Sequence, residues 1–327
     1  MKDGETLIEV KDLVKEFIIR RSFRPPARLR AVDGVSFSIY RGETFGLVGE
    51  SGCGKSTLGR AILRILPPSS GQVWFSGTDI TGLSGKALEP FRRRMQIIFQ
   101  DPYASLNPAM QVRDIIAEPL RLKSRLSRED CDRQVRDMMV QVGMSAGDMS
   151  KYPHEFSGGQ HQRISIARAL IVRPEFILCD EPISALDVSI QAQVVNLLED
   201  LQREFGLTYL FVAHDLSMVR HISHRIAVMY MGEIVEIAGA GEIYENPLHP
   251  YTRALLQAVP VPDPRRARES PPSPLEGEPP SPLETKRGCA FFSRCPRARE
   301  VCRTRRPSLG DTGTGHQVAC LDQASSA

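Results

Sequence analysis

Long apolar runs are absent from this sequence of 327 residues. No stretch approaches the roughly 18 consecutive apolar residues that a membrane-spanning helix needs. The opening MKDGETLIEV carries acidic residues and has no apolar segment typical of an export signal. We therefore expect a protein that stays in the cytoplasm and reaches a membrane only through partners.

A strong charge of one sign is also missing. The net charge is +3 with 25% charged residues, which is too mild to indicate nucleic-acid binding, and the 41% hydrophobic residues suffice for a packed core. The segment RRSFRPPARLR, Arg20 to Arg30, is strongly basic and contains two prolines. We predict a solvated loop there and expect no nucleic-acid partner.

Close cysteine pairs of the kind found in zinc sites are lacking too. Three of the seven cysteines are scattered over the first 180 residues, which argues against a disulfide framework. The other four are separated by 5, 6 and 17 residues in the C-terminal tail: Cys289, Cys295, Cys302 and Cys320. Four soft thiolates still suggest a metal, so an iron–sulfur cluster, zinc and ordinary thiols all remain open.

Short apolar segments alternate with helical patterns along most of the chain. This alternation predicts an α/β core with a parallel sheet. The stretch REDCDRQVRDMMVQVGM predicts an amphipathic helix, and the helix from Val188 should end at Gly206. Strands are expected at residues 6–20, 35–39, 44–49, 71–77, 95–100, 175–181, 208–215 and 225–240.

The stretch GESGCGKST fits the P-loop pattern and stands between a predicted strand and a predicted helix. Backbone N–H groups of such a loop cradle phosphates, Lys55 neutralises the β- and γ-phosphates, and the Ser56 hydroxyl ligates Mg²⁺. We predict that the loop binds ATP and Mg²⁺. Its residues are Gly49, Glu50, Ser51, Gly52, Cys53, Gly54, Lys55, Ser56 and Thr57.

Two acids end the apolar strand FILCDE. Asp180 can hold Mg²⁺ through water, and Glu181 can turn toward the γ-phosphate as the general base that polarises the attacking water. The alternative is a pair of solvated acids at a strand end. The P-loop upstream favours the catalytic interpretation.

The segment FSGGQHQR, Phe156 to Arg163, precedes this strand and resembles the signature motif of ATP-binding-cassette (ABC) ATPases. Ser157, Gly158, Gly159 and Gln160 open a helix and present a second anion site. The resemblance implies that two cassettes dimerise head to tail, each signature closing on the ATP held by the other P-loop.

Further positions follow from the same resemblance. Gln100 is similar to the Q-loop glutamine, which contacts Mg²⁺ and the attacking water. Ser184–Asp187 resembles the D-loop. His214 resembles the switch histidine, which contacts the γ-phosphate. Phe17 is a candidate for stacking on adenine or, alternatively, a core phenylalanine. The implied fold is a P-loop NTPase cassette with a RecA-like parallel sheet, an antiparallel β subdomain and a helical signature subdomain, followed by a small cysteine-rich extension.

The domain boundaries are predicted as follows. Residues 5–260 form the cassette, with the helical subdomain at about 101–165. Residues 261–286 form a proline-rich linker, and residues 287–327 form the cysteine-rich tail.

The stretches QDPYASLNP and GEIVEIAGAGEIYENPLHPYTRALLQAVP resemble the oligopeptide/dipeptide permease ATPases, of the second subunit type. This implies a bacterial peptide importer at the cytoplasmic face of the inner membrane. Its partners would be a second ABC ATPase subunit, two transmembrane permease subunits that dock near Tyr103–Pro108, and an external substrate-binding protein.

The resemblance leaves alternatives open. The cargo could be nickel or another small solute, and the chain could be a soluble, non-transport cassette that remodels nucleic acid or protein complexes. The ATPase pair could be a homodimer or a heterodimer. The tail resembles the C-terminal cysteine motif of these permease ATPases, and the resemblance implies a [4Fe–4S] cluster at the four cysteines. Four thiolates suit such a cluster.

Overall fold

The computed structural model describes residues 4–21, 24–121, 126–214, 216–258, 277, 280–281, 287–313 and 315–322. The chain forms two compact units. The first comprises Tyr40–Gly42 and Gly82–Val212, with Gly4 and Glu5, and the second comprises Thr6–Ile39, Glu43–Thr81 and the described residues from Ala213 onward. The predicted domain boundaries, including a separate cysteine-rich extension, stay predictions.

Three parallel strands form the sheet of the first unit. They are β6 (Met95–Ile98), β7 (Phe176–Asp180) and β8 (Thr208–Ala213), with β7 paired to both neighbours. Every residue of β7 and β8 is buried, which is why both read as continuous apolar runs. α2 (Gly85–Arg94) precedes β6, and α7 (Val188–Phe205) ends at Gly206 in a left-handed conformation with φ 66°, as predicted.

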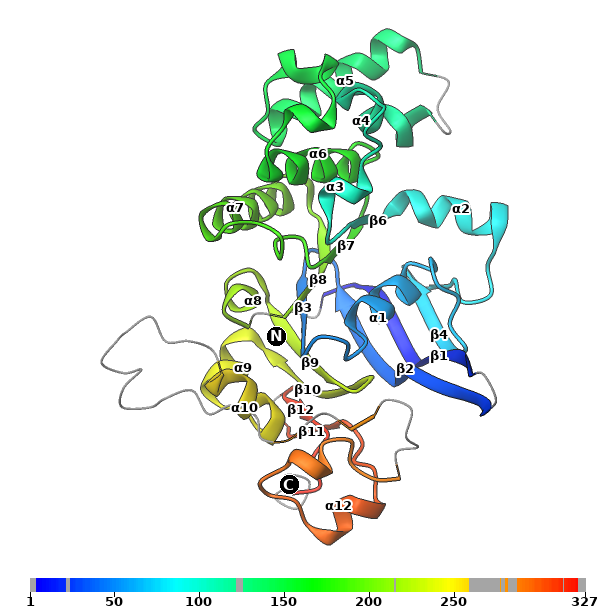
Figure 1. Cartoon of the computed structure of the whole chain (residues 1–327), viewed down its shortest axis with the longest axis vertical. Coiled ribbons are helices and arrows are strands. Elements are labelled where there is room, and N and C mark those ends of the chain that lie inside the picture. Colours follow the sequence, from blue (N-terminus) through cyan, green and yellow to red (C-terminus); the bar gives the residue numbers. More distant parts are fainter. Residues whose placement is uncertain are drawn as a thin grey trace, which may run out of the picture. The chain divides into compact units, whose positions relative to one another are not determined.

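The helices between β6 and β7 form a layer of their own. They are α3 (Pro102–Ser105), α4 (Val112–Arg121), α5 (Arg128–Gln141) and α6 (Gly158–Leu170). Two short 3₁₀ turns, Ala146–Ser150 and Pro153–Glu155, lie between α5 and α6. α4 packs against both α5 and α6 (Figure 1). α5 begins where the Ser127 hydroxyl accepts a hydrogen bond from the Asp130 N–H, and it buries Cys131, Val135, Met138 and Met139 on one face.

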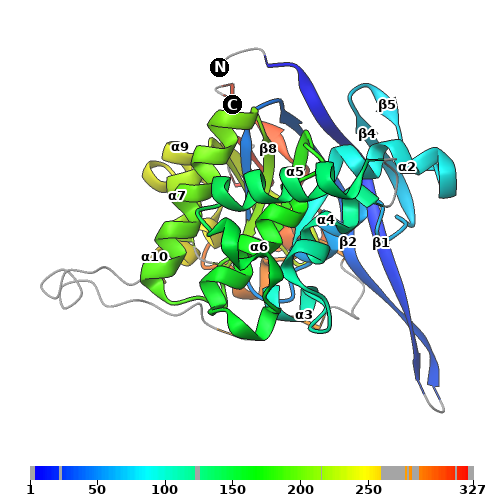
Figure 2. The ribbon, with the colours of Figure 1, turned by 90° about the horizontal axis from the view of Figure 1, so that it is seen from above.

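An antiparallel sheet in the second unit has the strand order β2-β1-β4-β5. Its members are β1 (Thr6–Arg21), β2 (Arg24–Tyr40), β4 (Ser70–Phe75) and β5 (Thr78–Asp79). β1 and β2 run side by side as a long ribbon (Figure 2). This sheet is the antiparallel β part that the resemblance implies.

The loop predicted for Arg20–Arg30 is wrong, because β1 extends to Arg21 and β2 begins at Arg24. β2 is an edge strand and pairs with β1 alone in this sheet. A proline is tolerated there, because its missing N–H can face the unpaired side. The arginine charges are also paired across the ribbon: Arg30 Nε lies 2.6 Å and Arg28 Nη1 3.5 Å from the Glu16 carboxylate. The basic segment is therefore a paired strand surface, not a free loop.

A second group of strands in this unit carries the P-loop. β3 (Thr44–Val48) runs parallel to β9 (Arg225–Tyr230), which pairs with the antiparallel β10 (Glu233–Gly239). α1 (Lys55–Ile62) follows β3 in the chain. α8 (Leu216–Ile222) packs against β3. α9 (Ala240–Glu245) and α10 (Pro250–Gln257) follow β10.

The C-terminal tail extends this sheet. β12 (Gln317–Val318) pairs with β10, and β11 (Gly310–Asp311) pairs with β12; the tail also holds α12 (Glu300–Thr304) and a 3₁₀ turn at Phe292–Arg294 (Figure 1). The predicted proline-rich linker lies almost wholly outside the described residues.

A buried carboxylate joins the tail to the sheet. Glu236, fully buried on β10, accepts hydrogen bonds from the Leu248 N–H at 2.7 Å and the His249 N–H at 3.0 Å. Its Oε1 also lies 2.7 Å from Nε2 of His316 in the tail. Because a buried carboxylate is costly unless it is fully hydrogen-bonded, His316 ties the tail to the cassette strands.

Candidate nucleotide site

The loop between β3 and α1 is closely packed against neighbouring backbone. A Cβ at Gly49 would lie 2.2 Å from the Met229 carbonyl oxygen, and one at Gly54, whose φ is 111°, would lie 2.0 Å from the Ala31 carbonyl oxygen. Both distances are far below any real contact. Glycine is therefore required at both ends of the loop, where the chain turns with no room for a Cβ.

Lys55 closes the loop. Its ammonium donates hydrogen bonds to the carbonyl oxygens of Gly49 at 2.8 Å and Glu50 at 3.0 Å, and the residue is only 4% exposed. In the described part of the chain it forms no ion pair with a carboxylate. Ser56 and Thr57 follow in the first turn of α1, where N–H groups and the helix dipole favour an anion. Burial raises the pKa of the Cys53 thiol, so it stays neutral beside this cation.

At the acidic end of β7, two of the predicted site residues, Gln100 and Glu181, are in contact. Asp180 is fully buried at the end of β7. Glu181 follows with φ 49°, a left-handed conformation that is uncommon for this residue type, and its Oε2 accepts a hydrogen bond from Gln100 Nε2 at 2.8 Å. The sequence alone could not show this contact, because the two residues are 81 positions apart.

The predicted signature residues open α6. Ser157 is the N-cap, and its N–H donates to Gln160 Oε1 at 2.9 Å, one half of a capping box. A Cβ at Gly159 would lie 2.7 Å from Ile190 on α7, so a side chain there is excluded by packing. Gly158 has more room. Asp187 is the N-cap of α7.

Two predicted residues remain, His214 at a strand end and Phe17 within a strand. His214 is exposed directly after β8. Phe17 on β1 is half-buried, with the Lys15 ammonium 5.2 Å from its ring centroid, so it is not a fully buried core residue. Its role in adenine stacking stays a prediction.

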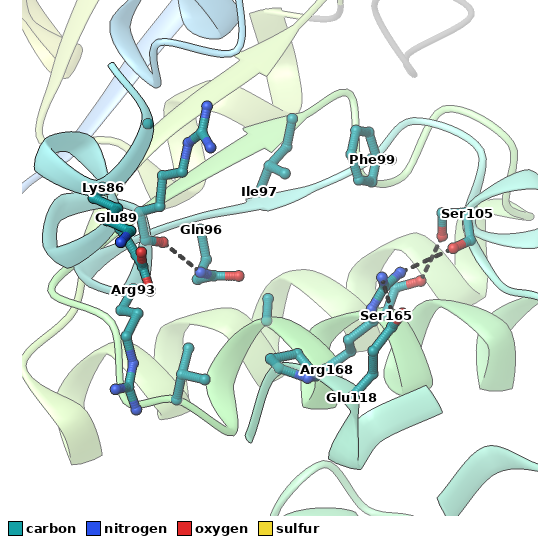
Figure 3. A pocket seen from close by; sticks show the side chains of 15 residues that line it. Lys86, Glu89, Arg93, Gln96, Ile97, Phe99, Ser105, Glu118, Ser165 and Arg168 are labelled. Carbon is teal, nitrogen blue, oxygen red and sulfur yellow. Dashed lines mark hydrogen bonds and ion pairs between the residues drawn. The ribbon is translucent and has the colours of Figure 1, made fainter. Parts of the chain in front are cut away.

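A cavity of about 680 Å³ opens in the first unit beside the strand that leads to Gln100. Phe99 and Ile97 lie on one side of it, and four basic residues, Lys86, Arg92, Arg93 and Arg168, line it (Figure 3). Arg168 is held by Glu118 at 2.8 Å and by the Ser105 carbonyl oxygen at 3.0 Å. Sequence reasoning missed this cavity, because α2, β6 and α6 only meet in the fold.

The four tail cysteines line one small cavity, together with Phe291 and Phe292. All four are half-buried free thiols, and burial raises the pKa of Cys289 to about 11. Within the described ranges, no group of three or more metal-ligating side chains is arranged to hold a metal ion. The geometry thus does not support the iron–sulfur assignment, which stays a prediction.

Fold and loop together place the chain among the P-loop nucleotide-binding proteins of cassette type. The ABC transporter family matches residues 32–184, and the family described as "Oligopeptide/dipeptide transporter, C-terminal region" matches residues 235–302. Among solved structures, the dimeric ATP-binding cassette MJ0796 in a post-hydrolysis state with ADP and Pi is similar at 28% identity and a TM-score of 0.64, over 72% of this chain and 99% of that one.

Curated relatives match over almost the whole chain. The oligopeptide transport ATP-binding protein OppF of Salmonella typhimurium is 52% identical over 98% of this chain and 97% of its own length. The corresponding AppF of Bacillus subtilis is 50% identical, over 97% of both chains. This chain belongs to the ABC transporter ATP-binding proteins of the oligopeptide permease family. No helix in the part of the chain that the structure describes could cross a membrane.

Proposed function

We propose that this chain is the ATP-hydrolysing subunit that powers import of oligopeptides through an ABC transporter. The observation that carries the proposal is the match to oligopeptide transport ATP-binding proteins over nearly the full length, including the C-terminal region at residues 235–302. A match confined to the cassette would support ATP binding alone. Nickel or another small solute is the alternative cargo.

The proposed residue roles at the nucleotide are those that the motifs and the family resemblance imply. The P-loop N–H groups and Lys55 bind the phosphates, and Ser56 and Asp180 would hold Mg²⁺. Mg²⁺ supplies neutralisation of the charge that develops on the phosphates. Glu181, held by Gln100, accepts the proton of the attacking water, and His214 contacts the γ-phosphate.

Hydrolysis requires a second cassette in this proposal. Ser157 to Gln160 and Asp187 close on the ATP of a partner ATPase subunit, and the pair sits at the cytoplasmic face of the cell membrane. Two permease subunits and an external binding protein complete the transporter. ATP favours the closed pair and ADP the open one, and this difference in binding moves the permease.

The cavity of Figure 3 and the adjoining α3 surface are proposed to receive a permease segment. Tyr103 is 57% exposed, with its ring packed edge-on against His161 at 5.4 Å, so it presents an aromatic face next to Gln100. Exposed aromatic residues of this kind often anchor protein interfaces. α3 begins at Pro102, shortly after Gln100 in the chain, so a docked segment could sense the nucleotide state through this glutamine.

We expect Tyr103→Asp to lower peptide-stimulated ATPase activity of the assembled transporter at least tenfold, because a charge would be buried at the interface. MgATP binding by the isolated chain should change little, because Tyr103 lies outside the P-loop. Val140→Asp on α5, at a site 61% exposed, is the matched control. Normal peptide uptake by the Tyr103 variant would place the docking surface elsewhere.

For the four tail thiols we propose a [4Fe–4S] cluster, which rests on the resemblance of the tail to the permease ATPases. The thiols line one cavity, although they are not arranged around a metal ion in the described residues. Each iron of such a cluster takes one thiolate, so the four sulfurs stand farther apart than around a single ion. The cluster would supply a rigid crosslink of the tail. Protein purified without oxygen should contain about four irons per chain and lose them in Cys302→Ser, but not in Cys131→Ser. Iron-free protein under these conditions would remove the cluster.

The test of the function is purification of the tagged chain from mildly solubilised membranes, followed by reconstitution. Two permease subunits and a second ATPase should accompany it, and peptides should stimulate ATP hydrolysis while nickel does not. Stimulation by nickel alone would change the cargo. Recovery with ribosomes or nucleic acid would overturn the transport assignment in favour of a soluble cassette.

A further inference from the structure

Arg294 connects the cysteine-rich tail to the P-loop. Its two terminal nitrogens donate to the two carboxylate oxygens of Glu50, at 2.9 Å and 3.0 Å, although the residues are 244 positions apart. The arginine side chain is only 4% exposed. This is a two-pronged guanidinium–carboxylate pair, the geometry in which arginine binds most strongly and which lysine cannot reproduce.

Glu50 is held at its backbone as well. Its N–H donates to the Tyr251 hydroxyl at 2.9 Å, and Tyr251 packs against Tyr230 and Phe291 with ring centroids 4.6 Å and 5.4 Å away. Arg294 in turn lies 5.9 Å from the Tyr230 ring centroid. Both the side chain and the main chain of the second P-loop position are thus fixed by residues outside the loop.

The charge of Glu50 explains why the pair matters. A carboxylate in a loop that receives phosphates repels them. The Glu50 side chain is 29% exposed, so water screens this repulsion only in part. The hydrogen bonds to Glu50 raise the pKa of Arg294, so the guanidinium stays charged at every physiological pH. Arg294 therefore cancels the one negative side chain in the stretch Gly49–Thr57.

We propose that Arg294 is a positioning residue for ATP binding, which neutralises Glu50 and fixes the P-loop backbone that receives the phosphates. The inference rests on the proposed ATP site. Arg294 stands directly before Cys295 and after Cys289, within the segment that contributes to the cysteine cavity. Nucleotide affinity therefore depends on the tail being folded around its cysteines.

The test compares MgATP binding by calorimetry in the full chain. Arg294→Gln should weaken binding at least tenfold, because Glu50 is left unpaired beside the phosphates. Arg294→Lys should fall between this variant and the wild type. Arg303→Gln, at an exposed tail arginine that pairs with Glu300, should bind as the wild type does.

A double variant separates positioning from a general loss of structure. Glu50→Gln removes the uncompensated charge, so Arg294→Gln/Glu50→Gln should bind MgATP several-fold more tightly than Arg294→Gln alone. The absence of such rescue would overturn the proposal, and so would binding by Arg294→Gln within twofold of the wild type. If Arg294→Gln does not fold, binding by Arg294→Lys equal to that of the wild type overturns it instead. Failure of the wild type itself to bind MgATP would refute the ATP site, a separate outcome.

Discussion

Glu181→Gln is expected to lower the ATPase rate of the assembled transporter by about 10²- to 10⁴-fold, the usual contribution of a general base. The amide can still accept the hydrogen bond from Gln100, which is 2.8 Å from the carboxylate, but it cannot take a proton from water. ATP binding should persist, because the phosphate contacts lie in the P-loop. The variant should therefore accumulate as an ATP-bound closed cassette pair.

The measurements are phosphate release from the reconstituted transporter and size-exclusion chromatography of the cassettes with MgATP. Glu129→Gln on the exposed start of α5 is the matched control and should hydrolyse normally. Turnover by Glu181→Gln near the wild-type rate would mean that another group activates the water.

Lys55→Ala is expected to weaken MgATP binding about 100-fold, equivalent to about 3 kcal/mol for a buried charged hydrogen-bonding group. The ammonium is 4% exposed and held by two loop carbonyl oxygens, so its loss removes a fixed positive charge from the loop. Calorimetric titration with MgATP measures the effect. Lys11→Ala, at an exposed lysine on β1 paired with Glu9, serves as the control.

The two variants separate binding from hydrolysis. Lys55→Ala should lose both, whereas Glu181→Gln should lose hydrolysis alone. An unchanged MgATP affinity in Lys55→Ala, with the fold intact by thermal unfolding, would contradict the assignment of residues 49–57 as the nucleotide loop.

Local features of the fold could be predicted because neighbouring residues decide them. The glycine at the end of α7, the amphipathic face of α5 and the fully buried apolar strands β7 and β8 each follow from spacing and residue type over a few positions. The P-loop belongs to this class too, since its strand, turn and helix are contiguous. The basic strand β2 does not, because its pairing with Glu16 depends on register between two strands.

The amino-acid sequence by itself determined the family, the phosphate-binding loop and the acidic pair Asp180 and Glu181, since each is recognised from short contiguous motifs. Only the tertiary structure decided that Gln100 meets Glu181, that His316 meets Glu236, and that Arg294 meets Glu50. The members of these pairs are 80 or more positions apart. Each of these side chains could pair with many other charged or hydrogen-bonding residues of the chain. Which partner it meets is therefore decided by how the helices and strands pack.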